Sequence, residues 1–178
     1  DEYLKGRHLR HLRSAEGFRG AVRCFRRALE LDPTFAAAHA GLADTYAVLG
    51  MWFYAALPPA KAFTPARAAV QEALRLDPGL AEAWMTLGFI QYEYDWDWKA
   101  AERCFQRALD LDPSLSGAHY GLGFLLLRRG DVAGGAKHLE AFLDAPPKGA
   151  EAERWIRHAQ DTLEELRAPR DEPAEPEA

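Results

Sequence analysis

The sequence lacks most of the features that mark catalytic, metal-binding and membrane-spanning proteins. Its 178 residues include only two cysteines, and no apolar stretch is long enough to span a bilayer. The phosphate-binding glycine loop, G-x-S-x-G and H-E-x-x-H are all missing. We therefore expect no enzymatic activity, no catalytic residue, no cofactor, no metal site and no membrane insertion by this segment.

The sequence also lacks the alternation of apolar and polar residues that is typical of β-strands. Apolar residues instead recur at i, i+3, i+4 and i+7, which predicts helices throughout. Asp-Pro pairs mark helix ends, because a residue that precedes proline is driven out of the helical region. The predicted helices cover residues 3–13, 17–31, 36–49, 65–76, 81–94, 98–111, 116–129, 132–144 and 150–167.

Three near-identical heptapeptides, at residues 27–33, 72–78 and 107–113, reveal an internal repeat. A degenerate fourth copy ends at Pro147, and the spacings between the four prolines are 45, 35 and 34 residues. A period near 34 is typical of architectures in which each unit buries its apolar face only against its neighbours. Such an array offers a surface for binding and has no central catalytic pocket.

The residues inside the repeats resemble those of the tetratricopeptide repeat family. Trp84-x-x-Leu87-Gly88, then Ala101-x-x-x-Phe105, then Pro113 follow the family pattern, and similar residues occupy the same positions in neighbouring units. The resemblance covers roughly residues 1–147. It implies an all-α fold, a right-handed α-solenoid of about four helix pairs with a C-terminal capping helix.

This resemblance divides the chain into one repeat domain and a tail. The domain covers residues 1–167, and its parts are the repeats at about 1–34, 35–79, 80–114 and 115–148 and the capping helix at 150–167. The second repeat contains an insertion at residues 51–61. Residues 168–178 carry four acids and no large apolar side chain, so we expect a disordered acidic tail.

Charge and cysteine placement bear on partners and location. The net charge is −5, with +3 in residues 1–33 and −8 in the remainder, a poor composition for binding nucleic acid. Cys24 and Cys104 lie two repeats apart, too far for a disulfide, so free thiols and a cytoplasmic location are expected. No secretory signal is visible in the sequence. The chain begins at Asp1 and not at methionine, as a fragment or a processed form would.

The first helices of the third and fourth repeats are apolar on two faces. One face carries the repeat pattern, and the other carries Met85, Phe89 and Tyr92 in one helix and Tyr120 and Phe124 in the next. A helix with two apolar faces is buried on both or offers one to a partner. The first repeat or the capping helix could also cover this second stripe and make it ordinary core.

The family resemblance implies that the first helices line a concave groove. The groove residues expected from it are the stripe and its polar neighbours: Asp44, Met85, Phe89, Tyr92, Glu93, Tyr120, Phe124 and Arg128. Aromatic side chains with a charged rim are typical of hot spots for a bound peptide or helix. The lysine, asparagine and arginine by which some family members grip a peptide C-terminus are missing from this face, which argues against a carboxylate-clamp adaptor.

Two further segments are candidates for contacts. The insertion contains Trp52, Phe53 and Tyr54, which either dock a partner or fold back onto their own repeat. The segment 94–98 places Trp96 where glycine is usual. Together with the inserted second repeat, this segment resembles the repeat regions of bacterial multidomain regulators.

The sequence thus favours a protein–protein interaction module that binds a peptide or helix in a concave groove. Its expected setting is a regulatory or scaffolding domain of a larger bacterial protein, with a separate protein or a domain of the same polypeptide as partner. A self-associating scaffold is the alternative. An RNA-binding helical repeat is less consistent with the acidic charge.

Overall fold

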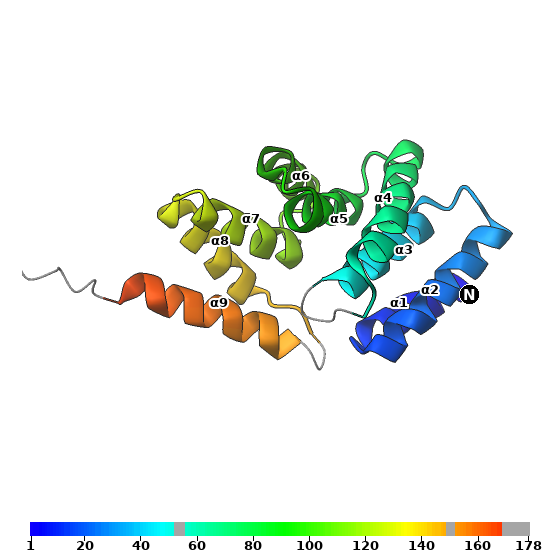
Figure 1. The fold of residues 1–178 in the computed structure, drawn as a ribbon, viewed down its shortest axis with the longest axis horizontal. Coiled ribbons are helices and arrows are strands. Elements are labelled where there is room, and N and C mark those ends of the chain that lie inside the picture. Colours follow the sequence, from blue (N-terminus) through cyan, green and yellow to red (C-terminus); the bar gives the residue numbers. More distant parts are fainter. Residues whose placement is uncertain (52–55, 149–151, 169–178) are drawn as a thin grey trace, which may run out of the picture.

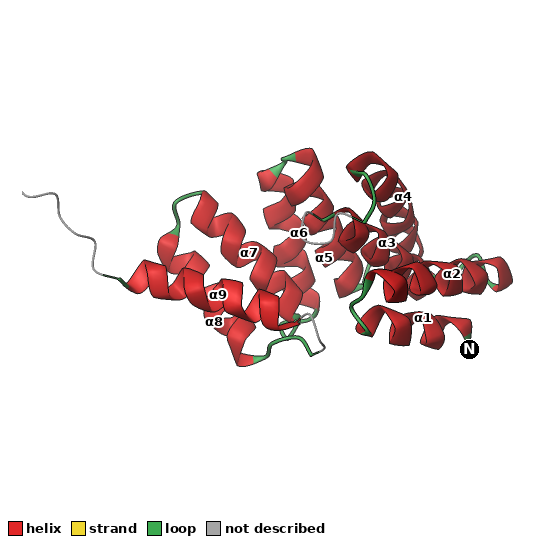
Figure 2. Cartoon of the chain, turned by 60° about the horizontal axis from the view of Figure 1, so that its bottom comes forward, coloured by secondary structure: helices red, strands yellow, loops and turns green. Residues whose placement is uncertain are grey.

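The computed structural model describes residues 1–51, 56–148 and 152–168, and Figures 1 and 2 show them as helices joined by short loops. The helices are α1 (Glu2–His11), α2 (Ala15–Leu31), α3 (Ala36–Gly50), α4 (Pro59–Leu76), α5 (Ala81–Ile90), the π-helix η1 (Gln91–Asp95), α6 (Trp98–Leu111), α7 (Ser116–Arg128), α8 (Val132–Asp144) and α9 (Ala152–Arg167). No strand occurs among these residues. None of the described helices is long and apolar enough to cross a bilayer.

The helices pack in consecutive pairs, α1 with α2, α3 with α4, α5 with α6 and α7 with α8, and α9 packs against α8. Each pair also contacts the next pair along the chain, so the pairs follow an arc in Figure 1. The predicted all-α solenoid with a capping helix is confirmed. Residues 52–55, 149–151 and 169–178, which include Trp52, Phe53, Tyr54 and nearly all of the predicted tail, lie outside the described residues.

Two predicted helix boundaries were wrong. Helix α4 begins at Pro59 and not at residue 65, because Ala62 and Phe63 are buried against Gly50 of α3 and draw the end of the insertion into the helix. Proline at the first helical position has no need of an N–H donor there. Helix α5 ends at Ile90 and continues as the π-helix η1, where a continuous α-helix was predicted.

The described residues at the two ends of the insertion, Met51 and residues 56–57, lie against their own repeat. Met51 is buried, and the backbone N–H of Leu57 donates to the carbonyl of Leu49 at 3.1 Å. Leu57 also packs against the core cluster that contains α3 and α4. The fold-back prediction for Trp52, Phe53 and Tyr54 concerns residues outside the described ranges and stays a prediction.

In the first and third repeats, small residues let one phenylalanine fill the space between three helices. Phe105 of α6 is fully buried, and a Cβ on Gly88 of α5 or on Gly121 of α7 would come within 2.8 Å and 2.5 Å of its ring. Gly41 of α3 meets Phe25 of α2 in the same way, with 2.7 Å for its Cβ. This close approach of helices is the physical reason for glycine in the repeat pattern.

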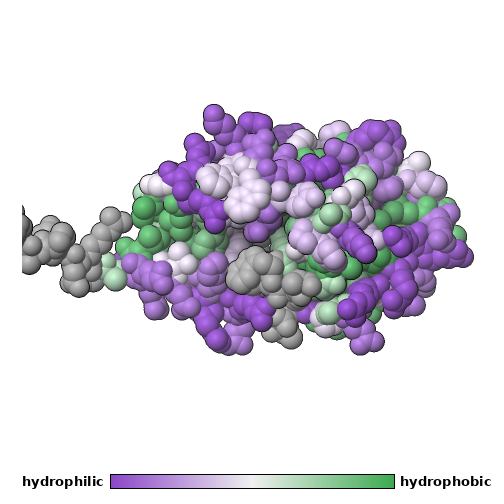
Figure 3. All heavy atoms as spheres, in the orientation of Figure 1, coloured by the Kyte–Doolittle hydropathy of each residue, from purple (hydrophilic) through white to green (hydrophobic). Residues whose placement is uncertain are grey.

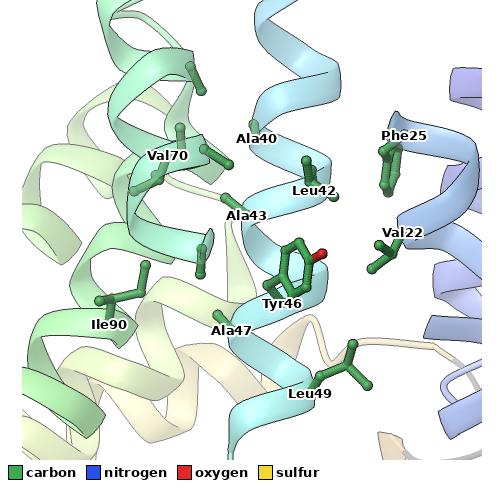
Figure 4. Packing of buried hydrophobic residues seen from close by; sticks show 14 of the residues in the cluster. Val22, Phe25, Ala40, Leu42, Ala43, Tyr46, Ala47, Leu49, Val70 and Ile90 are labelled. Carbon is green, nitrogen blue, oxygen red and sulfur yellow. The ribbon is translucent and has the colours of Figure 1, made fainter. Parts of the chain in front are cut away.

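The core of the first two repeats shows the same layering in detail. Figure 4 shows Leu42 and Tyr46 of α3 directed toward Val22 and Phe25 of α2. On the opposite side, Figure 4 shows Ala40, Ala43 and Ala47 of α3 facing α4 and α5. Buried alanines allow α3 and α4 to pack along much of their length.

The turns between repeats are closed by side-chain hydrogen bonds. Asp32, Asp77 and Asp112 each accept a backbone N–H from the residue two positions later, at 2.8–2.9 Å. A ring nitrogen then bonds the preceding proline carbonyl in all three repeats. These bonds are His39 to Pro33 at 2.9 Å, Trp84 to Pro78 at 2.9 Å and His119 to Pro113 at 3.1 Å. The ring residue at this position therefore closes the turn between repeats by a hydrogen bond.

The turns inside repeats share a left-handed residue followed by a helix cap. Ser14, Asp97 and Asp131 each accept a backbone N–H three residues later, at 2.9–3.0 Å, as N-cap side chains do. The residue before the cap has a positive φ in each case: 46° at Arg13, 58° at Trp96 and 87° at Gly130. Only the last of the three is glycine, the residue that adopts this conformation without strain.

Candidate functional site

Two adjoining cavities open on the side of the solenoid formed by its first helices. The larger has a volume of about 810 Å³ and is lined by α5, α7, α9 and the segments around Met51 and Phe63. The smaller, of about 420 Å³, lies toward α1 and α3. Both are lined by Met51, Phe89, Tyr120 and Trp155, so they form one groove, named here the concave groove.

The structure brings the eight predicted groove residues together along this groove. Six of them line the larger cavity: Phe89, Tyr92, Glu93, Tyr120, Phe124 and Arg128. The other two, Asp44 and Met85, line the smaller cavity. Their convergence follows from the repeat geometry, because equivalent first helices present the same face to one side of the solenoid.

The apolar stripe of α5 and η1 runs along both cavities: Met85 lines the smaller, Tyr92 lines the larger and Phe89 lines both. Phe89 makes an edge-to-face contact with Phe105, with ring centroids 5.0 Å apart, and is half-buried. Met85 packs against Gly117 of α7, where an added Cβ would lie 2.7 Å from its sulfur. Tyr92 of η1 is also half-buried, so this stripe remains partly open to a ligand.

The stripe of α7 is largely covered by the capping helix. Tyr120 is only 6% exposed, and its ring lies 5.1 Å from that of Trp155 in α9. Its hydroxyl bonds Nδ1 of His158 at 2.7 Å, and burial raises the pKa of Tyr120 well above its ordinary value. Phe124 stacks on His158 at 4.4 Å. The sequence left open whether the second apolar stripe is covered or open to a partner. The capping helix covers Tyr120, whereas the stripe residues of α5 are only half-buried.

An aromatic cluster surrounds Arg128 at the rim of the larger cavity. Its guanidinium carbon lies 5.6 Å from the ring centre of Tyr92, 6.0 Å from that of Trp96 and 5.4 Å from that of Trp98. Within the described part of the chain the Arg128 side chain has no ion-pair or hydrogen-bond partner. Stacking on ring faces leaves the in-plane N–H donors of an arginine available to an incoming acceptor.

Glu93 places an acceptor beside this donor. Burial raises the pKa of the Glu93 carboxyl, and the positive charge of Arg128 opposes that shift. No hydrogen bond or ion pair of the Glu93 side chain occurs among the described residues. The rim of the larger cavity therefore offers one donor and one acceptor that the fold itself does not use.

Helix α4 holds the π-helix in place behind this rim. Phe63 stacks on Tyr94 with ring centroids 5.0 Å apart, and Arg67 forms an ion pair with Asp95. The N–H of Asp97 donates to the carbonyl of Gln91 at 3.1 Å and closes the turn around Trp96. The insertion-bearing repeat thus positions the exposed Trp96 at the groove.

Asp44, the predicted acidic residue of the second repeat, is engaged within the fold. It forms an ion pair with Arg10 of α1 beside the smaller cavity. A paired carboxylate has little surplus charge for a partner, so Asp44 belongs to the wall of the groove. The residues that sequence reasoning missed are Arg10, Arg13, Met51, Trp155 and His158, which come from α1, the α1–α2 and α3–α4 connections and α9. No repeat pattern identifies these positions.

Two chemical features can be judged from the described residues: groups of metal ligands and reactive thiols. No group of three or more histidine, cysteine or acidic side chains among them is placed to hold a metal ion. Cys24 and Cys104 are buried and free, and burial raises the pKa of Cys104 to about 11. A thiol with so high a pKa is a weak nucleophile near neutral pH.

Comparison with known sequences supports the repeat interpretation. The tetratricopeptide repeat family matches residues 7–51 and 96–152, which together make up more than half of the chain. No protein of curated function matches the sequence.

Comparison with solved structures gives the same architecture. MamA superposes with a TM-score of 0.55 at 24% identity, over 86% of this chain and 84% of that one. YrrB, described as a repeat protein of this type with an unusual peptide-binding site, gives 0.53 at 22% identity over 93% and 80%. An O-GlcNAc transferase of Thermobaculum terrenum gives 0.58 at 20% identity, over 88% of this chain but 26% of that one. At these identities the likeness is one of fold alone.

Proposed function

The chain belongs to the tetratricopeptide repeat family, whose members are in general non-enzymatic interaction modules, and we propose that its concave groove binds a peptide or helix of a partner protein. The observation that carries this proposal is the half-buried stripe of Phe89 and Tyr92 on the floor of a cavity of about 810 Å³. That volume lies within the range of about 300–1,000 Å³ typical of ligand sites.

The groove offers the chemistry that peptide recognition requires. Phe89 and Tyr92 supply apolar surface on a rigid helix, and aromatic side chains of this kind dominate many interfaces. Glu93 and Arg128 supply an acceptor and a donor at the rim, and neither side chain has a hydrogen-bond or ion-pair partner among the described residues. A peptide backbone presents both N–H and C=O groups, so one extended segment can satisfy both side chains.

The face seen in Figure 3 fits a binding surface of mixed character. Hydrophobic residues, drawn in green, lie among hydrophilic ones over α7 and α8 and again over the α2–α4 side. Interfaces that form and dissociate have this mixed composition, whereas obligate interfaces are more apolar. We infer that the partner is another protein, or another domain of the same polypeptide, and that the module acts in regulation or scaffolding.

The unusual peptide-binding site of YrrB supports the same proposal by analogy of fold. The predicted groove residues fall into two groups according to their exposure and their contacts within the fold. Met85, Phe89, Tyr92, Glu93 and Arg128 are proposed to contact the peptide. Asp44, Tyr120 and Phe124 form the supporting walls.

A selection from random peptides followed by calorimetric titration of the enriched peptides tests this proposal. Phe89→Ala removes an aromatic anchor and should weaken binding by about tenfold or more, as hot-spot truncations do. Arg128→Glu should also weaken it. The matched control is Arg107→Glu, which makes the same charge change on an exposed residue of α6 outside the groove.

Each outcome bears on the proposal. Weaker binding by the two groove variants, with the control unchanged and all melting temperatures similar, supports binding in the groove. Equal affinity for all variants would place the peptide elsewhere on the solenoid. Tyr120 is left intact, because its truncation would open a hole beneath α9 and confuse binding with stability.

A further inference from the structure

The smaller cavity carries a surplus of positive charge at its mouth. Arg10, Arg13 and Lys148 line it, with His11 beside them, and Asp44 is the acid on its wall. Because Asp44 is already paired with Arg10, the positive charges of Arg13 and Lys148 are not balanced by an acidic side chain of the cavity lining. Neither the Arg13 nor the Lys148 side chain has an ion-pair or hydrogen-bond partner within residues 1–51, 56–148 and 152–168.

Arg13 holds this position in a strained backbone conformation. Its φ of 46° lies in the left-handed region, which costs free energy for any residue with a Cβ. The equivalent turn of the fourth repeat uses Gly130 at a φ of 87° and avoids that cost. The third repeat adopts the same conformation at Trp96, with a φ of 58°, so it belongs to the turn itself; in the first repeat it places an arginine next to a cavity.

A neighbouring titratable group responds to the same positive field. The pKa of His11 is lowered by burial and then by the charges of Arg10, Arg7 and Arg13, with Asp44 opposing them. A shallow hollow of about 150 Å³ next to the cavity adds Arg7 and Glu82, one charge of each sign. The excess of positive charge at this end of the groove therefore persists when the surrounding acids are counted.

Below this charged mouth the cavity is apolar. Met85 and Phe89 of α5 and Leu115 at the start of α7 line it, together with Met51 and Trp155. An apolar side chain of a bound peptide fits such a floor, and an acidic neighbour in the same peptide would meet the cations at the mouth. Net charge of −5 over the whole chain makes a nucleic-acid backbone a poor occupant.

We propose that Arg13 and Lys148 form an anion-binding subsite that recognises a carboxylate side chain of the partner peptide, next to an apolar residue that enters the smaller cavity. This inference rests on the proposed function and specifies the class of partner as an acidic-apolar peptide segment. The subsite combines Arg13, at the turn between α1 and α2, with Lys148, which follows α8. It is separate from the helix positions that were considered for a carboxylate clamp.

Titration with two synthetic peptides tests the proposal. One carries leucine and phenylalanine flanked by glutamates, and the other has lysines in place of the glutamates. Wild-type protein should bind the acidic peptide more tightly, and added salt should weaken that binding. Arg13→Gly should reduce the affinity for the acidic peptide by roughly tenfold, as the loss of a hydrogen bond to a charged group does.

The same variant separates binding from folding. Because glycine relieves the left-handed strain, Arg13→Gly should melt at the wild-type temperature or above it. Arg107→Gln is the matched control, since it removes one positive charge from an exposed residue of α6 outside the groove. If Arg13→Gly does not fold, Arg13→Asn keeps a residue that tolerates this conformation, and Lys148→Gln tests the second cation without a backbone change.

The outcomes distinguish this inference from the proposed function. A preference for the acidic peptide that is lost in Arg13→Gly and Lys148→Gln supports the subsite. Equal binding of both peptides, unchanged in these variants but weakened by Phe89→Ala, would overturn the subsite and leave the groove intact. Failure of the wild type to bind either these peptides or any selected random peptide would overturn both.

Discussion

Replacement of Gly121 by alanine tests whether close helix approach around Phe105 holds the third and fourth repeats together. An added Cβ would lie 2.5 Å from Cζ and 2.7 Å from Cε1 of the Phe105 ring. Real Cβ atoms do not approach other atoms so closely, so either the ring or α7 must move. Phe105 is fully buried, and Gly88 of α5 confines the ring on its other side, with 2.8 Å for an added Cβ.

The expected magnitude follows from two opposing effects. Overpacking of a filled core costs about 1–3 kcal/mol. Alanine in place of glycine in the middle of a helix returns about 1 kcal/mol through its better helix propensity. The difference is a loss of about 0–2 kcal/mol in the free energy of unfolding, and confinement of the ring by Gly88 as well places Gly121→Ala in the upper half of that range.

Gly20→Ala provides the control, because it makes the same chemical change within helix α2. Its added Cβ would meet Leu9 Cδ1 at 3.1 Å, the far end of a flexible side chain that is able to rotate away. The helix-propensity gain should then dominate, and this variant should be as stable as the wild type or more stable.

Urea titration followed by circular dichroism is a suitable assay, with a thermal melt as a second measurement. For a chain of this size a loss of 1 kcal/mol corresponds to a fall of about 2–4 °C in melting temperature. Gly121→Ala should therefore melt a few degrees below the wild type. A variant that melts at or above the wild-type temperature would refute the idea that Phe105 is confined between Gly88 and Gly121.

Three further predictions concern the turns and the pair of His119 in α7 and His138 in α8, whose Nδ1 atoms lie 2.9 Å apart. Trp96→Gly should raise the free energy of unfolding by up to about 1 kcal/mol in urea titration, since it relieves a left-handed conformation; a clear loss would contradict this. Asp131→Ala should lower it by about 1 kcal/mol through loss of the 2.9 Å cap to Gly134, whereas Asp131→Asn should stay near wild type. Burial, followed by the charge of His119, lowers the pKa of His138 below 6.5, so the folded state binds fewer protons and acid weakens folding as pH falls through that value. His138→Asn should reduce this loss of melting temperature on acidification, and an unchanged pH dependence would argue against it.

The repeat pattern predicted the fold and most of the groove because both depend on local rules applied several times. Asp-Pro pairs end helices, small residues permit close packing, and equivalent first helices present the same face to one side. Phe89, Tyr92 and Arg128 could be assigned to that side from their places in the repeat. The unusual residue Trp96 was also visible in the sequence, because glycine normally occupies its position.

Two features of the groove depend on contacts between distant segments. Tyr120 and Met85 occupy equivalent positions in α7 and α5, yet Tyr120 is buried under Trp155 and His158 of α9, whereas Met85 is only half-buried. The direction in which a capping helix crosses the last repeat is set by packing across more than thirty residues of chain, which no periodic pattern encodes. Likewise, the burial of Phe63 against Gly50 decided that α4 begins at Pro59.

The sequence by itself determined the all-α repeat architecture, the register of each helix pair and the side on which a groove forms. Tertiary structure alone decided which groove residues remain accessible, that Asp44 is neutralised by Arg10, and that Arg13 and Lys148 meet at one cavity. The physical reason is one of range. Helix periodicity and turn chemistry act over a few residues, whereas exposure and charge balance are set by side chains that the superhelix brings together from separate repeats.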